Sequence, residues 1–154
     1  MNGEWFEAKI KYEKEQENGL MKKVSENYLV DALTFSEAEA RIIEELRPYM
    51  RGEFEVADLK KVRYVELLDS ENEEDDLWFK GKLVIITLDE KTAKEKKSSV
   101  QVLVKAHDIR SAIAHIEHKL GQSMMDFTVA GVTETPIIDV YKFKAGILPS
   151  ISWL

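Results

Sequence analysis

Trp5-Phe6-Glu7-Ala8-Lys9 returns 73 residues later as Trp78-Phe79-Lys80-Gly81-Lys82. Phe54-Glu55-Val56-Ala57 returns at the same offset as Phe127-Thr128-Val129-Ala130. A constant offset between separate matching stretches indicates an internal duplication. The chain is therefore expected to fold as two copies of one unit.

Composition limits the kinds of protein this chain can be. Its 154 residues suit one domain of ordinary size, and the 44% hydrophobic and 33% charged residues are typical of a globular protein. There is no cysteine, which excludes disulfides and thiolate metal sites. The longest apolar run, residues 83–86, has the length of a strand and is too short to span a membrane. A cytoplasmic protein without a membrane segment is expected.

The net charge of −7 is unevenly distributed. Six acids lie within residues 69–76, and the rest of the chain carries a net charge of −1. Such an acidic stretch is typical of a solvated loop joining two halves. The overall charge therefore does not exclude an anionic partner elsewhere on the surface.

Alternating side chains in the first copy predict a hairpin. From Phe6 to Tyr12, every second residue is apolar or aromatic, as in a half-buried strand. Asn18-Gly19 suits the positive φ angles of a tight turn. A second strand is expected to run back as far as Ala32, within a stretch that recurs in the second copy at an offset of 74.

Thr34 and Glu37 form the pattern of a capping box, so a helix is expected to begin near Phe35. Pro48 is expected to end it. Residues 54–67 read as extended, with a shift of apolar parity around residues 57–62 that predicts a bulge or a short break. The apolar stripe of the helix consists of Phe35, Ala38, Ile42 and Leu46.

The second copy repeats this order. Strands are expected at residues 78–88 and 99–106, followed by a helix that Asp108 caps and that Gly121 ends in the left-handed C′ conformation. Gly131 and Pro136 interrupt the last extended run, residues 127–141, which predicts an edge or bent strand. The matching stripe consists of Ile109, Ala112, Ile116 and Leu120.

These elements predict an α+β fold of two tandem β-β-α-β repeats, in which two helices pack on mainly antiparallel sheet with pseudo-twofold symmetry. The repeats are residues 4–68 and 77–143, joined by the acidic linker 69–76 and followed by an apolar tail, residues 144–154. One helix on a three-stranded sheet buries little surface. The two repeats are therefore expected to share a core within a single domain of residues 1–154.

The strand faces opposite the predicted core carry the main candidate site. Aromatic rings beside ammonium groups on a sheet can stack nucleic-acid bases and neutralise phosphates. The alternative is that each tryptophan covers a sheet rim while the lysines solvate an exposed face. The residues are Trp5, Lys9 and Lys11 in the first copy and Trp78, Lys80 and Lys82 in the second.

The histidines are weaker candidates. His115 and His118 have the i, i+3 spacing of two metal ligands, with His107 nearby, but their equivalents Arg41 and Glu44 cannot form the same site. No metal or cofactor is expected. The sequence lacks a Gly-rich phosphate loop, a nucleophile elbow and a His-Glu-x-x-His motif, so we expect a protein that is not an enzyme.

The chain resembles a family of small proteins from gut Bacteroidales and their phages that is catalogued as a domain of unknown function. The residues that carry the resemblance are Trp5-Phe6 with Lys9, residues 28–41, Trp78-Phe79-Lys80 and residues 86–91. It implies a phage or mobile-element setting and assigns no activity, cofactor or site residue. The tail from about Lys144 lies outside the resemblance.

The sequence thus favours a non-catalytic binding module for single-stranded nucleic acid. The alternative is a homo-oligomeric assembly or adaptor protein that associates through exposed strand edges and its apolar tail. The tail residues concerned are Ile147, Leu148, Ile151, Trp153 and Leu154.

Overall fold

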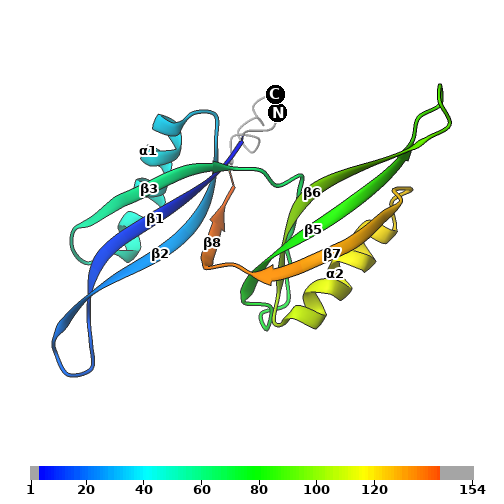
Figure 1. Ribbon diagram of the computed structural model, residues 1–154. Coiled ribbons are helices and arrows are strands. Elements are labelled where there is room, and N and C mark those ends of the chain that lie inside the picture. The colour runs from blue at the N-terminus through cyan, green and yellow to red at the C-terminus, as the bar shows by residue number, and fades with distance from the viewer. Residues whose placement is uncertain (1–3, 143–154) are drawn as a thin grey trace, which may run out of the picture. The chain divides into compact units, whose positions relative to one another are not determined.

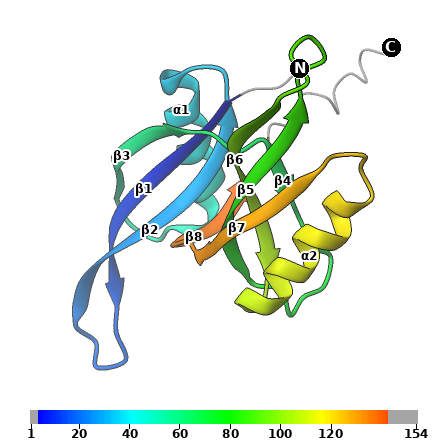
Figure 2. The ribbon, with the colours of Figure 1, turned by 45° about the vertical axis from the view of Figure 1, so that its right-hand side comes forward.

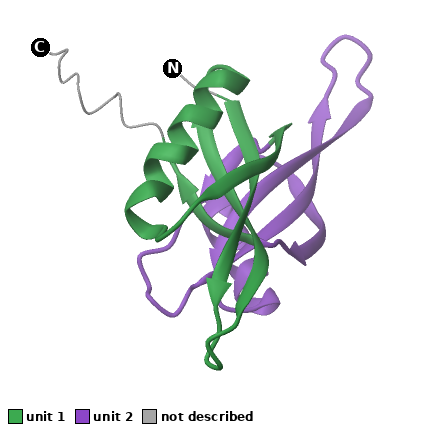
Figure 3. Cartoon of the chain, turned by 90° about the vertical axis from the view of Figure 1, so that its left-hand side faces the viewer, with its two compact units in different colours: residues 1–63, 137–154 green, residues 64–136 purple. Residues whose placement is uncertain are grey.

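The structure is a computed structural model that describes residues 4–142. The chain divides into two compact units (Figure 3). Unit 1 contains the described residues up to Arg63 together with those from Ile137 onward, and unit 2 is the continuous segment Tyr64–Pro136. The predicted binding residues of the tail, from Ile147 to Leu154, lie outside the described residues. The single domain of residues 1–154 stays a prediction.

Unit 1 contains a long hairpin, one helix and two further strands (Figure 1). The helix α1 packs on one face of a four-stranded sheet, here called sheet A, with the strand order β3-β1-β2-β8. The elements are β1 (Glu4–Glu15), β2 (Met21–Ala32), α1 (Phe35–Leu46), the 3-10 turn η1 (Arg47–Tyr49), β3 (Phe54–Val62) and β8 (Ile137–Tyr141).

Unit 2 has the same plan, with the helix α2 along one face of a second sheet, called sheet B (Figure 2). Its strand order is β4-β6-β5-β7. The predicted α+β class is thus confirmed, and neither described helix is long and apolar enough to cross a membrane. The elements are β4 (Glu66–Leu68), β5 (Leu77–Leu88), β6 (Glu95–Ala106), α2 (Ile109–Gly121) and β7 (Phe127–Glu134).

Each sheet has four strands instead of the expected three, because the fourth strand is supplied by the other repeat. β4 follows β3 of the first repeat along the chain, yet it pairs in parallel with β6 of the second. β8 follows β7 of the second repeat, yet it pairs in parallel with β2 of the first. The repeats therefore exchange strands reciprocally. The repeat boundaries predicted from the sequence did not include this exchange.

The local signals in the strands are confirmed. β1 and β2 are antiparallel, and Gly19 in the turn between them has a φ of 81°. The pairing of β1 with β3 shifts register at Ala57, and that of β5 with β7 shifts at the equivalent Ala130. Such bulges bend an edge strand, and β3 and β7 are both edge strands.

The helix ends differ from expectation in two details. The Glu37 amide donates to the Thr34 hydroxyl as predicted, but the Glu37 carboxylate accepts from the amide of Leu33 instead of completing the box at Thr34. Gly121 is the last residue of α2 and does not have a positive φ. The C-cap is Gln122, whose backbone is right-handed. The prediction of a left-handed Gly121 is therefore wrong.

Each unit has its own cluster of buried apolar side chains between helix and sheet. Most of both predicted helix stripes lies there, although Phe35 and Ile109, the first residue of each stripe, are half exposed. Phe35 still contacts the core, because its ring meets Phe6 edge to face at 4.9 Å. At Gly81 in unit 2 the helix lies close to β5, since an added Cβ would lie 2.7 Å from Ile116 Cδ1.

We expect Gly81→Ala to lower the free energy of unfolding by about 1–2 kcal/mol, because the new methyl group would overpack the contact with α2. Urea denaturation followed by circular dichroism measures the change. Gly131→Ala is the matched control, since a Cβ at Gly131 would meet nothing within 4 Å. Equal losses in the two variants would contradict the close approach.

Candidate functional site

The predicted tryptophan and lysine residues lie on the sheet faces opposite the helices. Phe6, Ala8 and Ile10 of β1 point into the core, so Trp5, Lys9 and the other odd-numbered residues point away from α1. The same alternation in β5 turns its even-numbered residues, Trp78, Lys80 and Lys82, away from α2. The structure thus confirms the parity of these side chains.

The burial of Trp78 removes half of the expected stacking platform. Only 2% of this residue is exposed, whereas Trp5 is half-buried. The carbonyl of Trp78 accepts hydrogen bonds of 2.9 Å from both the amide and the hydroxyl of Thr135. The Lys105 ammonium lies 5.6 Å from its ring centroid, a favourable cation–π distance. Trp78 therefore offers no free ring face for a nucleic-acid base.

The lysines of the two units have different neighbours. In unit 2, Lys82 lies between Gln101 and Gly131 on the adjacent strands. In unit 1, the equivalent Lys9 lies between Asn27 and Asp58. Cross-strand neighbours of opposite charge offset one another, so only the lysine in unit 2 has uncharged neighbours on both sides.

Two pairs of equivalent positions on the outer faces are reversed in charge, whereas Lys9 and Lys82 keep the same charge. Lys80 corresponds to Glu7, and Lys105 corresponds to Asp31. We call the side chains of Lys80, Lys82, Lys97 and Lys105, which lie on the side of sheet B away from α2, the lysine face. Lys82 and Lys97 are exposed, and the other two are half-buried. The outer face of unit 2 therefore carries lysines at two positions where unit 1 carries acidic residues.

Sequence reasoning missed a cluster around Asp75. This residue lies in the linker that was expected to be a solvated loop, yet it is only 3% exposed. Its carboxylate accepts a 2.5 Å hydrogen bond from the Ser70 hydroxyl and faces His107 Nδ1 at 3.0 Å. His115 Nε2 lies 3.9 Å from the other side of the carboxylate. No spacing motif links these residues, and only the presence of two histidines in the helix region hinted at them.

His115 also holds the end of β6. Its Nδ1 lies 3.0 Å from the Lys105 carbonyl, and because a carbonyl only accepts, Nδ1 is the protonated nitrogen. In unit 1 the equivalent Arg41 donates to the Asp31 carbonyl, which is the equivalent acceptor. Both copies thus tie the helix to the end of the second strand, and unit 2 uses a side chain that also faces Asp75.

The contacts of Asp75 change two pKa values. Burial acts to raise the pKa of Asp75, but hydrogen bonds from Ser70 and His107 and the charges of both histidines outweigh it, so the pKa is lowered. The hydrogen bond with Asp75 raises the pKa of His107, and the charges of Asp108 and Glu74 add to this effect. A charged carboxylate and a protonated imidazole therefore stabilise each other here.

The geometry of this cluster is that of a structural clasp. In a catalytic serine triad the histidine accepts the serine proton, whereas here Ser70 and His107 both donate to the same carboxylate. Within residues 4–142, no group of three His, Asp or Glu side chains is arranged to hold a metal ion. The exposed His118 does not join the cluster.

Unit 1 contains a different polar network, formed by residues of β1, β2 and β8. The hydroxyls of Tyr12 and Tyr28 donate to the two carboxylate oxygens of Glu26, at 3.0 and 2.9 Å. Tyr141 of β8 stacks on Tyr28 with ring centroids 6.0 Å apart. Burial raises the pKa of Tyr141 to about 12 and that of Tyr28 further. The equivalent residues of unit 2 are aliphatic: Ile85, Val100, Val102 and Leu68.

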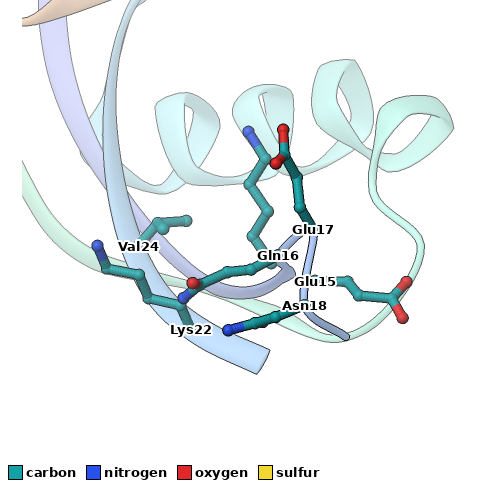
Figure 4. A pocket seen from close by; sticks show the side chains of 7 residues that line it. Glu15, Gln16, Glu17, Asn18, Lys22 and Val24 are labelled. Carbon is teal, nitrogen blue, oxygen red and sulfur yellow. The ribbon is translucent and has the colours of Figure 1, made fainter. Parts of the chain in front are cut away.

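A shallow concavity lies beside the tip of the β1–β2 hairpin (Figure 4). Glu15 and Lys22 point in opposite directions there, and Glu17 points away from both. Side chains that diverge in this way do not form a polar site for a small ligand. The concavity is lined by Lys14, Glu15, Gln16, Glu17, Asn18, Lys22 and Val24.

The fold and these clusters define an α+β protein of two homologous units that differ in their polar residues. The chain belongs to the family described as Domain of unknown function (DUF4494), whose model matches residues 4–143. No curated protein matches the chain. The part of the predicted resemblance that names a domain of unknown function is thus confirmed.

We expect Asp75→Asn to lower the free energy of unfolding by about 1–3 kcal/mol, since an amide group cannot accept from Ser70 and His107 as the carboxylate does. Urea denaturation measures the loss. Asp76→Asn is the control, because this substitution removes the same charge from the neighbouring residue, which is exposed. A loss of the same size in both variants would show that only the loss of charge matters.

The contact between His107 and Asp75 should also make stability depend on pH. Because the pKa of His107 is raised above 6.5, its contribution is complete below that pH and is lost as the pH rises through the raised value. Asp75, with its lowered pKa, stays charged throughout this window. The stability difference between the wild type and His107→Gln should therefore shrink as the pH rises above about 6.5.

Urea midpoints at a series of pH values measure this difference. The same substitution in an Asp75→Asn background is the control, because the partner carboxylate is then absent. An equally pH-dependent difference in that background would mean that His107 owes its effect to other groups.

Proposed function

We propose that the chain is a cytoplasmic, non-catalytic module that binds nucleic acid, with a single strand as the preferred form, through the lysine face of unit 2. The observation that carries this proposal is the set of four lysines on one side of β5 and β6, with uncharged neighbours at Lys82 where unit 1 has Asp58. Lysine ammonium groups neutralise the phosphates of a nucleic-acid backbone. The phage or mobile-element setting implied by the resemblance agrees with such a role.

The buried Trp78 changes how such binding would work. Its ring is not available for stacking, so the bases would contact Val84 and Ile86, which share the outer face of β5 and are half-buried. Phosphate contacts would then supply most of the affinity, and binding would weaken steeply with salt. The exposed part of the lysine face, at Lys82 and Lys97, is the expected point of contact.

The duplication supplies a matched test. Lys82→Glu with Lys97→Glu should weaken binding of a labelled single-stranded oligonucleotide by about tenfold or more, because two phosphate contacts become repulsive. Lys9→Glu with Lys23→Glu makes the same change of charge at the equivalent positions of unit 1 and should cost much less. Fluorescence anisotropy at low and moderate salt measures both variants.

The logarithm of the binding constant falls linearly with the logarithm of the salt concentration. The slope of this line should be steeper for the wild type than for the unit 2 variant by about one unit for each lost phosphate contact. Equal losses of affinity in both variants would point to a general charge effect, and no saturable binding by the wild type at low salt would remove the proposal. Circular dichroism of both variants controls for unfolding.

A homo-oligomeric assembly or adaptor protein is the second candidate. The edge strands of the described sheets are β3 and β8 in sheet A and β4 and β7 in sheet B, and Ile138 on β8 is half exposed. Exposed edges can pair with another chain. Deletion of residues 144–154 tests the part of this candidate that rests on the tail: a fall in mass by light scattering would support it, and an unchanged mass would contradict it.

A further inference from the structure

The reciprocal exchange of strands identifies an acceptor edge in each unit. β8 lies beside β2 in the register Leu29 to Val140, and β4 lies beside β6 in the register Leu103 to Leu67. Leu29 and Leu103 are equivalent residues of the two repeats, and both strands are parallel to the edge they join. The outer edge of the second hairpin strand is therefore built to accept a strand that arrives from outside its own repeat.

The two residues before β8, Thr135 and Pro136, direct the chain away from the sheet of its own repeat. The amide and hydroxyl of Thr135 both bond to the carbonyl of Trp78 in unit 2. Pro136 follows, lacks an amide donor and favours an extended conformation at Thr135. The chain therefore leaves the β7 ladder, and β8 begins directly after Pro136 as a separate short strand.

Few side chains hold β8 in place. Ile137, at its start, is 5% exposed, and Tyr141, at its end, stacks on Tyr28. Between them the register shifts at Ile138, and Ile138 and Asp139 are exposed. The acceptor edge therefore selects an extended segment with an apolar residue at its first position and an aromatic residue at its fifth.

We propose that the β2 edge of unit 1 is a strand-acceptor site that binds residues Ile137–Tyr141 of a second copy of this chain, giving a strand-exchanged dimer. The contacts of β8 with β2 are the same whichever chain supplies it, and only the Thr135–Pro136 tether differs between the two forms. The short tether gives the chain's own β8 a high effective concentration, of about 1 mM or more. Exchange therefore increases with protein concentration or when β8 is released from its own chain.

A disulfide test follows from the absence of native cysteine. Leu29→Cys with Val140→Cys places two thiols at paired positions of β2 and β8 within the usual range for a disulfide. Protein that is partly unfolded, refolded at high concentration and then oxidised should contain severalfold more disulfide-linked dimer than protein refolded when dilute. A non-reducing gel measures the two fractions.

Glu7→Cys with Leu29→Cys is the matched control, because it joins the two strands of one hairpin. This pair should cross-link within one chain at both concentrations. A dimer fraction at high concentration that is no larger in the first variant than in the control would overturn the proposal.

A second test uses a peptide. Ile137→Asp with Tyr141→Asp in the full chain removes both side chains that hold β8, and a labelled peptide of residues 135–142 should then bind at least tenfold more tightly than it binds the wild type, whose own β8 competes. A peptide carrying the same two aspartates is the control. A folded variant that fails to bind the peptide would contradict the proposal, and if the variant does not fold, the disulfide test decides.

Discussion

Each unit depends on the contact between one amphipathic helix and the middle of a long hairpin. In unit 2 a methyl group at Gly81 would lie only 2.7 Å from Cδ1 of the helix residue Ile116, so this side chain would have to shift to admit it. Burying a large apolar side chain contributes roughly 1.5–3 kcal/mol, and one helix supplies only a few such residues. The hairpin therefore needs a further strand on each side. One is the bulged edge strand, and the other is the strand supplied by the other repeat.

The two copies keep this framework and differ in their polar groups. The helix is tied to a strand carbonyl by Arg41 in one copy and by His115 in the other. Unit 1 fills one edge of its core with tyrosines around Glu26, whereas unit 2 has aliphatic residues there. The clasp around Asp75 is confined to unit 2, since it draws on the linker between the repeats. A duplicated framework can keep its stability while each copy acquires its own surface chemistry.

Local features of the fold could be predicted from the sequence because neighbouring residues determine them. The hairpin turn at Gly19, the cap at Thr34 and the bulge at Ala57 each follow from a few adjacent residues. The exchanged strands could not be predicted, since an extended segment such as Glu66–Leu68 carries no signal for which edge it joins.

The candidate site could likewise be predicted only where neighbouring residues determine it. Alternation along the strands correctly gave the face on which Trp5, Lys9, Lys80 and Lys82 lie. It could not give the burial of Trp78 or the reversed charges on adjacent strands, because both depend on contacts between residues far apart in the sequence. Asp75 was missed for a related reason: acidic composition predicts solvation on average, whereas the partners of one carboxylate, Ser70 and His107, decide whether it is buried.

The strand exchange also affects the order in which the protein can fold during synthesis. Unit 2 is a continuous segment that ends at Pro136, whereas unit 1 lacks its fourth strand until Tyr141 has been made. Contacts between residues so far apart in the chain form slowly, because a long loop must close first. The half of the protein that leaves the ribosome first is therefore the last to be completed, and until then the edge of its β2 strand stays open to other chains.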